Sequence, residues 1–481
     1  MRRSVSTDEI SKHAQVDDIW IVVNGMVYDV TQFAPGHPGG PEVIYQYAGG
    51  DASTKYNSTH SPCLIKDIEE HLIGDLDTAT VSTEWSKGDE TPRAPDTTKG
   101  DQKPPLEDII SLDDFEQVAM NTLSPKSWAY NSGAANDNIS RDANRTFLQR
   151  IWFRPAIMRD VSRVTTRSSL FGYDLDIPVY ISPLGAGKTI CEEGELPLAR
   201  GAASSGVIQC VSTVASYSFS EIMDETPMQA FYQVYVNKDR SKTEALVKQA
   251  EASAKIRALF ITADLPVMSK REDDERIKPE GYSVMKATHG KKSAGIAKSN
   301  SSFIDSSLNW NDMAWLRSIT KLPILLKGVQ RAEDAVIAMK VGFDGIVVSN
   351  HGGRAADTAP PAILILLEIH RHCPQVLGKL KVLVDGGFRR GSDVVKAICL
   401  GASAVGLGRS FGYALNYGQE GVEHAVNLLK EEIETAMQLV GMTDLMRDAG
   451  PTYLNTSGVD HLLPAYHSSS YIHITPRSTK L

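Results

Sequence analysis

The sequence predicts an α/β protein in which a large (β/α)8 barrel follows a smaller N-terminal α+β unit. Three observations support this fold class. Eight short apolar runs alternate with helical segments between residues 179 and 409, each run delivers a polar group near its end, and a polar stretch at residues 77–105 precedes the barrel. With 481 residues, the chain is also long enough for two domains or more.

The eight apolar runs have the pattern of buried parallel strands, which are apolar on both faces. They cover residues 179–183, 209–213, 230–236, 258–264, 323–328, 345–350, 381–386 and 404–409. Strands and helices that alternate eight times predict a closed barrel, and a doubly wound open sheet is the alternative. The polar residues at the run ends favour the barrel, because barrel chemistry collects at the C-terminal ends of the strands. They are Ser182, Ser212, Gln233 with Tyr235, Thr262 with Asp264, Lys327, His351, Asp385 and Arg409.

Composition divides the chain into four parts. Residues 1–76 mix short apolar strands with helical segments, which is typical of a compact unit. Residues 77–105 are rich in Thr, Ser, Asp, Glu, Lys and Pro, so we expect a solvated linker that acts as a hinge. Residues 106–465 form the barrel part, and 466–481 a tail. Residues 279–302, rich in Lys, Gly and Ser, are either a lid or a surface loop.

Charge and cysteine content limit the partners and the compartment. The formal net charge of −9 argues against nucleic acid or an anionic membrane surface as a partner. The five cysteines show no C-x-x-C spacing, as expected in a reducing compartment. We expect neither a membrane span nor a presequence, and hence a cytoplasmic protein. The ending Ser478-Thr479-Lys480-Leu481 is near the peroxisomal signal, and the peroxisome and the mitochondrial intermembrane space remain alternatives.

Two histidines in the N-terminal unit suggest a metal site. His37 lies in the tight turn Pro-Gly-His-Pro-Gly-Gly, and His60 follows 23 positions later. Two imidazoles on opposite faces of one iron give a closed, six-coordinate haem that suits electron transfer. The motif that begins at His37 resembles the H-P-G-G motif of the cytochrome b5 family, over residues 3–76. The resemblance implies that His37 and His60 hold haem b non-covalently, whereas His13 and His71 are incidental.

A second constellation belongs to the barrel. Ser349-Asn350-His351-Gly352-Gly353-Arg354 places a base and a cation three residues apart, just beyond a strand. Oxidising a 2-hydroxy acid requires a base for the proton and a cation for the carboxylate, roles that His351 and Arg354 can fill. Asp264 can stabilise the imidazolium of His351. Arg271 is either a second cation of the site or a solvated charge.

The last two strands are followed by phosphate-binding patterns. Asp385-Gly386-Gly387-Phe388-Arg389-Arg390-Gly391 and Gly406-Leu407-Gly408-Arg409 supply arginines and free amides where barrels bind phosphate. The sequence has no G-x-G-x-x-G fingerprint, which disfavours NAD or FAD on a Rossmann fold. FMN is therefore the expected cofactor, with Lys327 beside the flavin ring.

From about residue 106 to 465 the chain resembles the FMN-dependent 2-hydroxy acid dehydrogenase/oxidase family. The shared motifs are Trp128-Ala129-Tyr130, Gln233-Val234-Tyr235-Val236, Thr262-Ala263-Asp264, Ile324-Leu325-Leu326-Lys327-Gly328, Ser349 to Arg354 and Asp385 to Gly391. With the haem domain in front, the whole resembles the flavocytochrome b2 family of L-lactate dehydrogenases. That resemblance implies cytochrome c as electron acceptor and a homotetramer.

The resemblance also implies roles for individual residues. His351 is the base, Asp264 supports it, Tyr130, Tyr235 and Arg354 hold the substrate, and Arg271 stabilises charge near the flavin. The expected FMN positions are Ser182, Pro183, Leu184, Gly185, Ser212, Gln233, Thr262, Lys327, Asp385, Gly386, Gly387, Arg389, Gly408 and Arg409.

One departure from the family affects the substrate pocket. Pro183-Leu184-Gly185 stands where the family commonly has Pro-Thr-Ala or Ala-Thr-Ala, and Val214 stands where lactate-preferring members have Leu. Smaller side chains at 185 and 214 predict acceptance of bulkier acids such as L-mandelate. An oxidase that uses oxygen and a non-catalytic haem-binding module are the competing interpretations. The haem domain argues against the first, and the presence of His351 and Arg354 against the second.

Overall fold

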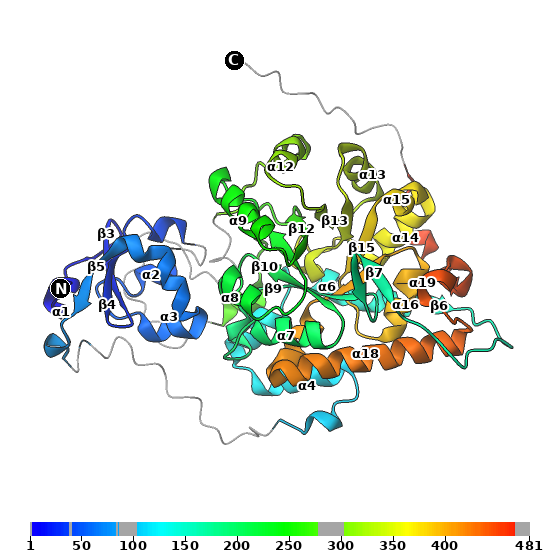
Figure 1. Cartoon of the computed structure of the whole chain (residues 1–481), viewed down its shortest axis with the longest axis horizontal. Coiled ribbons are helices and arrows are strands. Elements are labelled where there is room, and N and C mark those ends of the chain that lie inside the picture. The colour runs from blue at the N-terminus through cyan, green and yellow to red at the C-terminus, as the bar shows by residue number, and fades with distance from the viewer. Residues whose placement is uncertain (1, 38–40, 83–84, 86–102, 278–302, 467–481) are drawn as a thin grey trace, which may run out of the picture.

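The computed structural model describes residues 2–37, 41–82, 85, 103–277 and 303–466. Most of the expected linker, the segment 279–302 and nearly all of the expected tail lie outside these residues. Within the described part, a small N-terminal unit stands beside a large barrel (Figure 1).

The N-terminal unit is built on one five-stranded sheet with the strand order β1-β5-β4-β3-β2. The strands are β1 (Ser4–Val5), β2 (Ala14–Gln15), β3 (Asp18–Val23), β4 (Met26–Asp29) and β5 (Leu72–Leu76). Asn24 and Gly25 join β3 to β4 with φ of 53° and 76°, the left-handed values that a tight hairpin turn requires. Helices α1 (Thr7–Ile10), α2 (Glu42–Tyr45) and α3 (Ser53–Thr59) and 3-10 segments at Ala34–Gly36 and Pro62–His71 complete the unit.

The larger unit is a closed, all-parallel barrel of eight strands, so the predicted fold class is confirmed. The strands are β9 (Val179–Leu184), β10 (Ile208–Ser212), β11 (Ala230–Val234), β12 (Ile256–Thr262), β13 (Ile324–Val329), β14 (Gly345–Val348), β15 (Lys381–Asp385) and β16 (Ala404–Leu407). Strand β16 pairs with β9 and closes the ring. The predicted runs match these strands to within two residues at each end.

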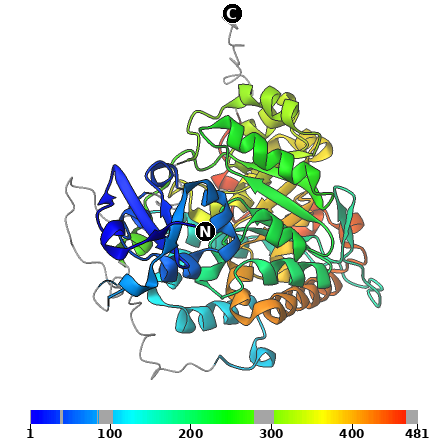
Figure 2. The same ribbon diagram turned by 60° about the vertical axis from the view of Figure 1, so that its left-hand side comes forward.

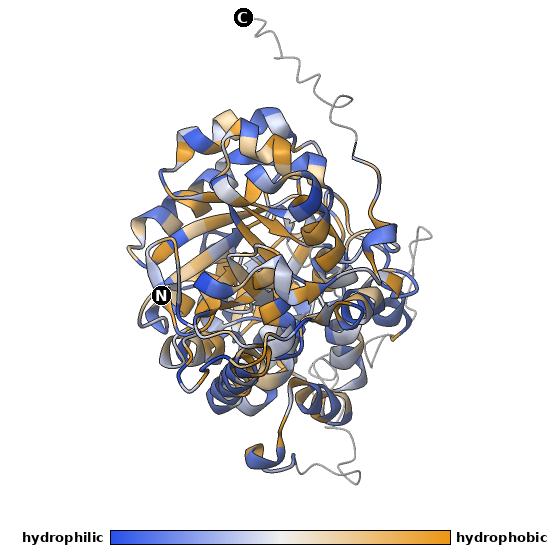
Figure 3. Ribbon diagram, turned by 90° about the vertical axis from the view of Figure 1, so that its right-hand side faces the viewer, coloured by the Kyte–Doolittle hydropathy of each residue, from blue (hydrophilic) through white to orange (hydrophobic). Residues whose placement is uncertain are grey.

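Helices surround the barrel in the order that a (β/α)8 fold requires (Figure 2). They are α7 (Leu196–Ser204), α8 (Phe219–Asp224), α9 (Arg240–Ala252), α10 (Glu272–Arg276), α12 (Met313–Ile319), α13 (Ala332–Val341), α14 (Ala362–His372), α15 (Pro374–Lys379), α16 (Gly391–Cys399), α17 (Arg409–Ala414), α18 (Gly418–Val440) and α19 (Leu445–Asp448). Apolar strands occupy the centre, and hydrophilic residues lie on the outer faces of the helices (Figure 3). Among the described residues, no helix is long and apolar enough to cross a membrane.

The interior of the barrel is a packed core. Tyr180, Phe231 and Phe260 fill it from three strands, and Phe231 and Phe260 stack with ring centroids 5.1 Å apart. A hairpin of β7 (Ser168–Leu170) and β8 (Tyr173–Leu175) packs against this core. Because side chains fill the barrel, a ligand has to bind at its rim.

Three helices that precede the barrel help to form the rim. They are α4 (Leu112–Thr122), α5 (Pro125–Ser132) and α6 (Ile139–Gln149). Helix α4 packs on α17, α5 on α10, and α6 on the turn at His351–Gly353. The short strand β6 (Trp152–Phe153) pairs with β17 (Leu454–Asn455).

Candidate functional site

The two predicted haem ligands face each other in the N-terminal unit. The ring centroids of His37 and His60 are 6.1 Å apart, and the ring planes are nearly perpendicular at 87°. An imidazole nitrogen bonds a transition metal at about 2 Å, so two rings on one ion need centroids about 6 Å apart. Burial lowers the pKa of His60 to about 4, so the imidazole is the neutral form that a metal binds. The residues present therefore fit a bis-histidine haem.

The two other histidines of this unit have different surroundings. His13 stacks on Trp20 with ring centroids 3.7 Å apart, and its Nδ1 lies 2.7 Å from an Asp18 carboxylate oxygen. His71 lies 3.6 Å from Glu70 and against Phe33. Both rings thus have partners within the protein, and the expectation that neither binds the metal stays a prediction.

A cavity of about 690 Å³ opens at the C-terminal rim of the barrel. It brings together the predicted substrate and catalytic residues Tyr130, Gly185, Val214, Tyr235, Arg271, His351 and Arg354. The same cavity is lined by all expected FMN positions, namely Ser182, Pro183, Leu184, Gly185, Ser212, Gln233, Thr262, Lys327, Asp385, Gly386, Gly387, Arg389, Gly408 and Arg409. Its volume is in the range of cofactor and drug-sized sites.

His351 and Asp264 form a hydrogen-bonded pair at this cavity. The Nδ1 of His351 lies 2.9 Å from Oδ1 of Asp264, whose side chain is fully buried behind the ring. Burial lowers the pKa of His351 despite the opposing effect of the carboxylate, so the imidazole is neutral near neutral pH. Burial alone would raise the pKa of Asp264, but His351 and Lys327 lower it, and the group is a carboxylate. Nδ1–H therefore donates to Asp264, which leaves Nε2 free to accept a proton from a ligand.

The hydroxyl of Tyr235 lies 3.4 Å from Nε2 of His351 on the side of the cavity. Burial raises the pKa of Tyr235 well above its usual range, so the phenol remains a hydrogen-bond donor. The base and this donor therefore meet at one point, where the hydroxyl group of a substrate can contact both.

Gly328 and Ser349 support this pair, and the sequence motifs that contain them did not reveal these roles. A Cβ at Gly328 would lie 2.4 Å from Cβ and 2.6 Å from Cγ of Asp264, and the residue has a left-handed φ of 104°. Only glycine fits there without displacing the carboxylate. The Oγ of Ser349 accepts the backbone N–H of His351 at 3.0 Å.

Three arginines line the cavity and give it positive charge. Arg354 donates to the backbone oxygens of Tyr130 and Asn131 at 2.7 Å each, and its guanidinium lies over the Tyr130 ring. Arg271 is 5% exposed and lines the cavity, which decides against a solvated charge. Burial and the neighbouring Arg354 lower the pKa of Arg271 to about 10 and that of Arg409 to about 9. Arg271 and Arg409 therefore remain cations at neutral pH, so an anionic ligand is favoured.

Lys327 supplies a further buried cation. Its Nζ lies 3.1 Å from Oδ2 of Asp385 and donates to Oγ of Ser349 at 3.0 Å. Burial alone would lower the pKa of Lys327, but Asp385 and Asp264 raise it, so the ammonium group stays charged. A fixed positive charge at this position can stabilise an anionic ring system above it.

Neighbouring strand ends carry a chain of amide and hydroxyl groups. Ser212 donates from Oγ to Oε1 of Gln233 at 3.1 Å, and Nε2 of Gln233 donates to Oγ1 of Thr262 at 3.0 Å. These buried side chains lie at or next to the last residues of β10, β11 and β12, and all line the cavity. They offer a planar polar ligand donors and acceptors along one edge.

The phosphate-binding patterns lie at the next strand ends. Gly387 has a φ of 83°, and a Cβ there would lie 2.4 Å from the backbone of Asn144, so glycine is required. Arg389 contacts Glu116 at 3.1 Å, and Arg409 begins helix α17, whose first turn has no side-chain cap. Amides and arginines thus converge where a phosphate tail can bind, and the residues present fit FMN.

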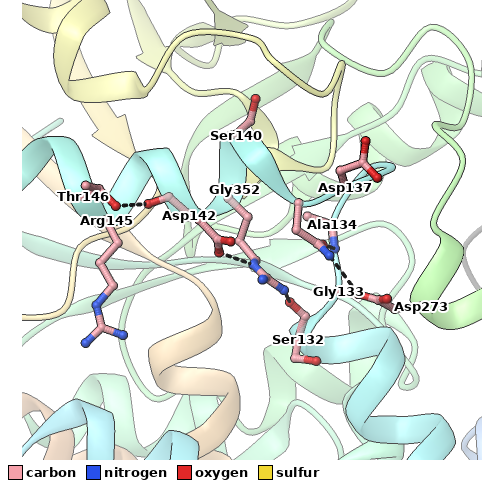
Figure 4. Close-up of polar contacts among 12 residues, drawn as sticks. Ser132, Gly133, Ala134, Asp137, Ser140, Asp142, Arg145, Thr146, Asp273 and Gly352 are labelled. Carbon is pink, nitrogen blue, oxygen red and sulfur yellow. Dashed lines mark hydrogen bonds and ion pairs between the residues drawn. The ribbon is translucent and has the colours of Figure 1, made fainter.

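Polar contacts join the loop between α5 and α6 to neighbouring elements (Figure 4). Arg141 donates to the Asp142 carboxylate at 2.8 Å and to the backbone oxygen of Ser132 at 3.3 Å. Asn138 donates to Asp273 at 3.0 Å, which joins the loop to α10. These contacts place the end of α5, with Tyr130, over the arginines.

The two small residues of the pocket touch each other. A Cβ at Gly185 would lie 2.7 Å from both Cγ2 and the backbone oxygen of Val214. The Leu184 side chain points toward α17 instead. A Cβ built at Gly412 of that helix would lie 2.8 Å from Cδ1 of Leu184. Val214 therefore packs on the glycine, and Leu184 packs toward α17 while still lining the cavity.

Two family models match the chain. Residues 119–456 match the FMN-dependent dehydrogenase family, and residues 6–77 match the cytochrome b5-like heme/steroid binding domain. The chain therefore belongs to the family of FMN-dependent dehydrogenases and carries a cytochrome b5-like domain in front of the barrel. FMN and haem are its cofactors.

Within that family, the relatives that are similar to this chain over nearly its whole length are of one type of enzyme. The chain is 41% identical over 466 residues to L-lactate dehydrogenase (cytochrome) of Wickerhamomyces anomalus, which covers 94% of this chain and 79% of the relative. It is also 41% identical to the Saccharomyces cerevisiae enzyme of the same name, over 92% of this chain and 78% of the relative. A double mutant of flavocytochrome b2 with pyruvate bound is 41% identical, with a TM-score of 0.69, covering 76% of this chain and 91% of that one.

Proposed function

We propose that this enzyme oxidises an L-2-hydroxy acid to the 2-oxo acid and passes the electrons through FMN and haem b to a cytochrome c-like acceptor. The observation that carries the proposal is the neutral His351 imidazole, held by Asp264 at 2.9 Å, in a cavity that also holds the cations Arg271 and Arg354. A base and a carboxylate-binding cation in one site are what this oxidation requires.

Each residue of the site has a separate role in the reaction. Arg354, with Arg271 and the Tyr130 side chain, holds the substrate carboxylate. The substrate hydroxyl lies between Nε2 of His351 and the Tyr235 hydroxyl. His351 takes up the proton, and Asp264 stabilises the resulting imidazolium through the Nδ1 hydrogen bond, as the carboxylate does in other His-Asp pairs.

Bound FMN supplies an acceptor for two electrons, and bound haem supplies a one-electron carrier. Lys327 stabilises negative charge on the flavin side of the cavity. Ser182, Pro183, Leu184, Gly185, Ser212, Gln233, Thr262, Asp385, Gly386, Gly387, Arg389, Gly408 and Arg409 hold FMN, and His37 and His60 bind the haem iron.

The substrate is L-lactate or a bulkier analogue such as L-mandelate. L-Lactate is supported by the names of the fungal relatives. A bulkier acid is supported by Gly185 and Val214 and by the likeness to a mandelate oxidase mutant with (S)-mandelic acid, which is 35% identical with a TM-score of 0.63. That likeness covers 72% of this chain and 98% of the other.

We extend the proposal to the organisation of the molecule. The haem domain spans residues 1–76, the linker 77–105, the FMN domain 106–465 and the tail 466–481. The enzyme is a cytoplasmic homotetramer without a membrane partner.

A substrate panel tests the proposed reaction. The purified holoenzyme is given L-lactate, L-2-hydroxyoctanoate or L-mandelate, and reduction of cytochrome c is followed beside consumption of oxygen. We expect cytochrome c reduction and formation of the 2-oxo acid. Oxygen consumption without cytochrome c reduction would support an oxidase instead.

A further inference from the structure

Two loops of the barrel form one hydrogen-bonded block beside the cavity. They are the segments 185–188 after β9 and 214–218 after β10. The Ala186 N–H donates to the backbone oxygen of Val214 at 3.2 Å, and the Lys188 N–H donates to Oγ of Ser216 at 3.1 Å. At its inner end this block lines the cavity, through Gly185 and Val214.

The outer end of the block contacts the N-terminal unit. Nζ of Lys188 donates to the backbone oxygen of Asn57 at 2.9 Å and to that of His60 at 3.1 Å. The Ser61 N–H donates to the backbone oxygen of Ser216 at 2.9 Å, and the Ser61 hydroxyl donates to Glu221. The block therefore extends from the flavin cavity to the backbone of a haem ligand.

A buried carboxylate joins the two loops from behind. Oε1 of Glu195 accepts the Gly187 N–H at 2.7 Å, and both carboxylate oxygens lie 3.0 Å from the Ser216 nitrogen. The residue is 1% exposed, and within the described part of the chain no Lys or Arg forms an ion pair with it. A Cβ at Gly187 would lie 2.9 Å from Cδ of Glu195, so the loop fits closely around the carboxylate.

We propose that Glu195 is a positioning residue for electron transfer from the flavin site to the haem site, because it fixes both loops that connect them. In each transfer the reduced flavin loses one electron, and the haem iron changes from Fe(III) to Fe(II). Glu195 touches neither cofactor site. Its carboxylate accepts the N–H groups of Gly187 and Ser216. The two loops that contain these residues form hydrogen bonds with His60 and Ser61 of the haem domain. The inference rests on the proposed function.

Glu195 changes its protonation state in a pH range in which enzyme kinetics can be measured. Burial raises its pKa to about 7, against the opposing effect of the Gly187 and Ser216 amides. Two titratable groups beside it, Cys191 and Tyr217, ionise in a higher pH range, because burial raises the pKa of Cys191 to about 11 and that of Tyr217 above its usual value. Both oxygens of the carboxylate accept hydrogen bonds, whereas a protonated carboxyl group keeps one carbonyl acceptor and turns the other oxygen into a hydroxyl that opposes the Ser216 amide. Contact between the domains should therefore weaken as the pH falls through about 7.

The test uses the full-length holoenzyme and the substitution Glu195→Gln. In anaerobic stopped-flow with L-lactate, flavin reduction should be unchanged and flavin-to-haem transfer about tenfold slower, the loss expected for one charge-assisted hydrogen bond. The pH dependence of that second step near pH 7 in the wild type should disappear in the variant. Hydrogen exchange of the oxidised protein should rise at residues 57–61, without a rise across the barrel strands.

Glu193→Gln is the matched control, since Glu193 is exposed and pairs with Arg200 at 2.7 Å. It should leave both steps and the exchange pattern unchanged. If Glu195→Gln does not fold, Lys188→Met removes the contact with His60 at the outer end of the same block and should give the same two effects. Unchanged haem reduction and exchange at 57–61 would overturn the proposal, as would an equal slowing of flavin reduction. If no hydroxy acid reduces the wild-type flavin, the proposed function fails, and the exchange measurement still decides the role of Glu195.

Discussion

Residue 185 offers the sharpest test of how the cavity selects its substrate. In Gly185→Ala the new Cβ would lie 2.7 Å from Cγ2 and from the backbone oxygen of Val214, closer than real Cβ atoms come to their neighbours. The backbone oxygen cannot rotate away, so the loop that carries Val214 has to shift. Both residues line the cavity, and the substitution therefore changes the pocket by about one methyl group.

A methyl-sized change in a hydrophobic pocket alters discrimination by about 1–3 kcal/mol, or about 10–200-fold in kcat/KM. We expect wild-type kcat/KM for L-2-hydroxyoctanoate and L-mandelate to rival or exceed that for L-lactate. Gly185→Ala should shift the ratio toward L-lactate by about 10-fold or more. The assay is initial-rate cytochrome c reduction with each acid, in both proteins.

Val214→Ala is the control in the opposite direction, because it enlarges the same space and should favour the bulkier acids. The double substitution removes the contact with Cγ2 and should bring the ratio back toward that of the wild type. A clear preference for L-lactate that none of these changes alters would refute the reasoning.

Three further predictions concern the base and the haem ligands. His351→Gln should lower kcat by about 10²–10⁴-fold or more while FMN and haem stay bound, because a positioned general base contributes about that factor. Turnover and the absorption spectra of flavin and haem measure this. Burial lowers the pKa of His351 below 6.5, and the neutral ring is the active form, so the fall of kcat/KM toward acid pH should have its midpoint below pH 6.5. His37→Ala or His60→Ala should abolish the haem spectrum and leave flavin reduction by substrate intact, as followed by flavin absorbance under nitrogen.

Each of these predictions has an outcome that contradicts it. Activity of His351→Gln within tenfold of the wild type would exclude His351 as the base. An acid limb with an apparent pKa well above 6.5 would mean that the ring is protonated at neutral pH, against the effect of its burial. Loss of flavin reduction in either haem-ligand variant would show that the two sites do not work separately.

The barrel could be predicted because its signals are local. Runs such as Ile324–Val329 are apolar on both faces, and the polar residue at each end reports which rim carries the chemistry. The cavity residues followed for the same reason, since Lys327, His351 and Asp385 each stand at a strand end. The two haem histidines were recognisable from the turn around His37.

The supporting contacts could not be predicted, because they join residues far apart in the chain. Nothing near Gly328 indicates that it packs against Asp264, and nothing near Glu195 indicates that it holds Ser216. Whether Arg271 is buried or solvated also depends on the tertiary structure around it, and it is 5% exposed. Predicting such contacts requires knowledge of how the chain runs through the whole barrel.

The central claim is that electrons pass from a 2-hydroxy acid to the flavin and only then to the haem. Anaerobic stopped-flow absorbance of the wild-type holoenzyme with L-lactate and L-mandelate measures this order directly. We predict that flavin absorbance falls first and that the reduced haem bands follow at a rate independent of substrate concentration. Flavin that stays oxidised with every acid, or haem that stays oxidised after the flavin is reduced, would contradict the account.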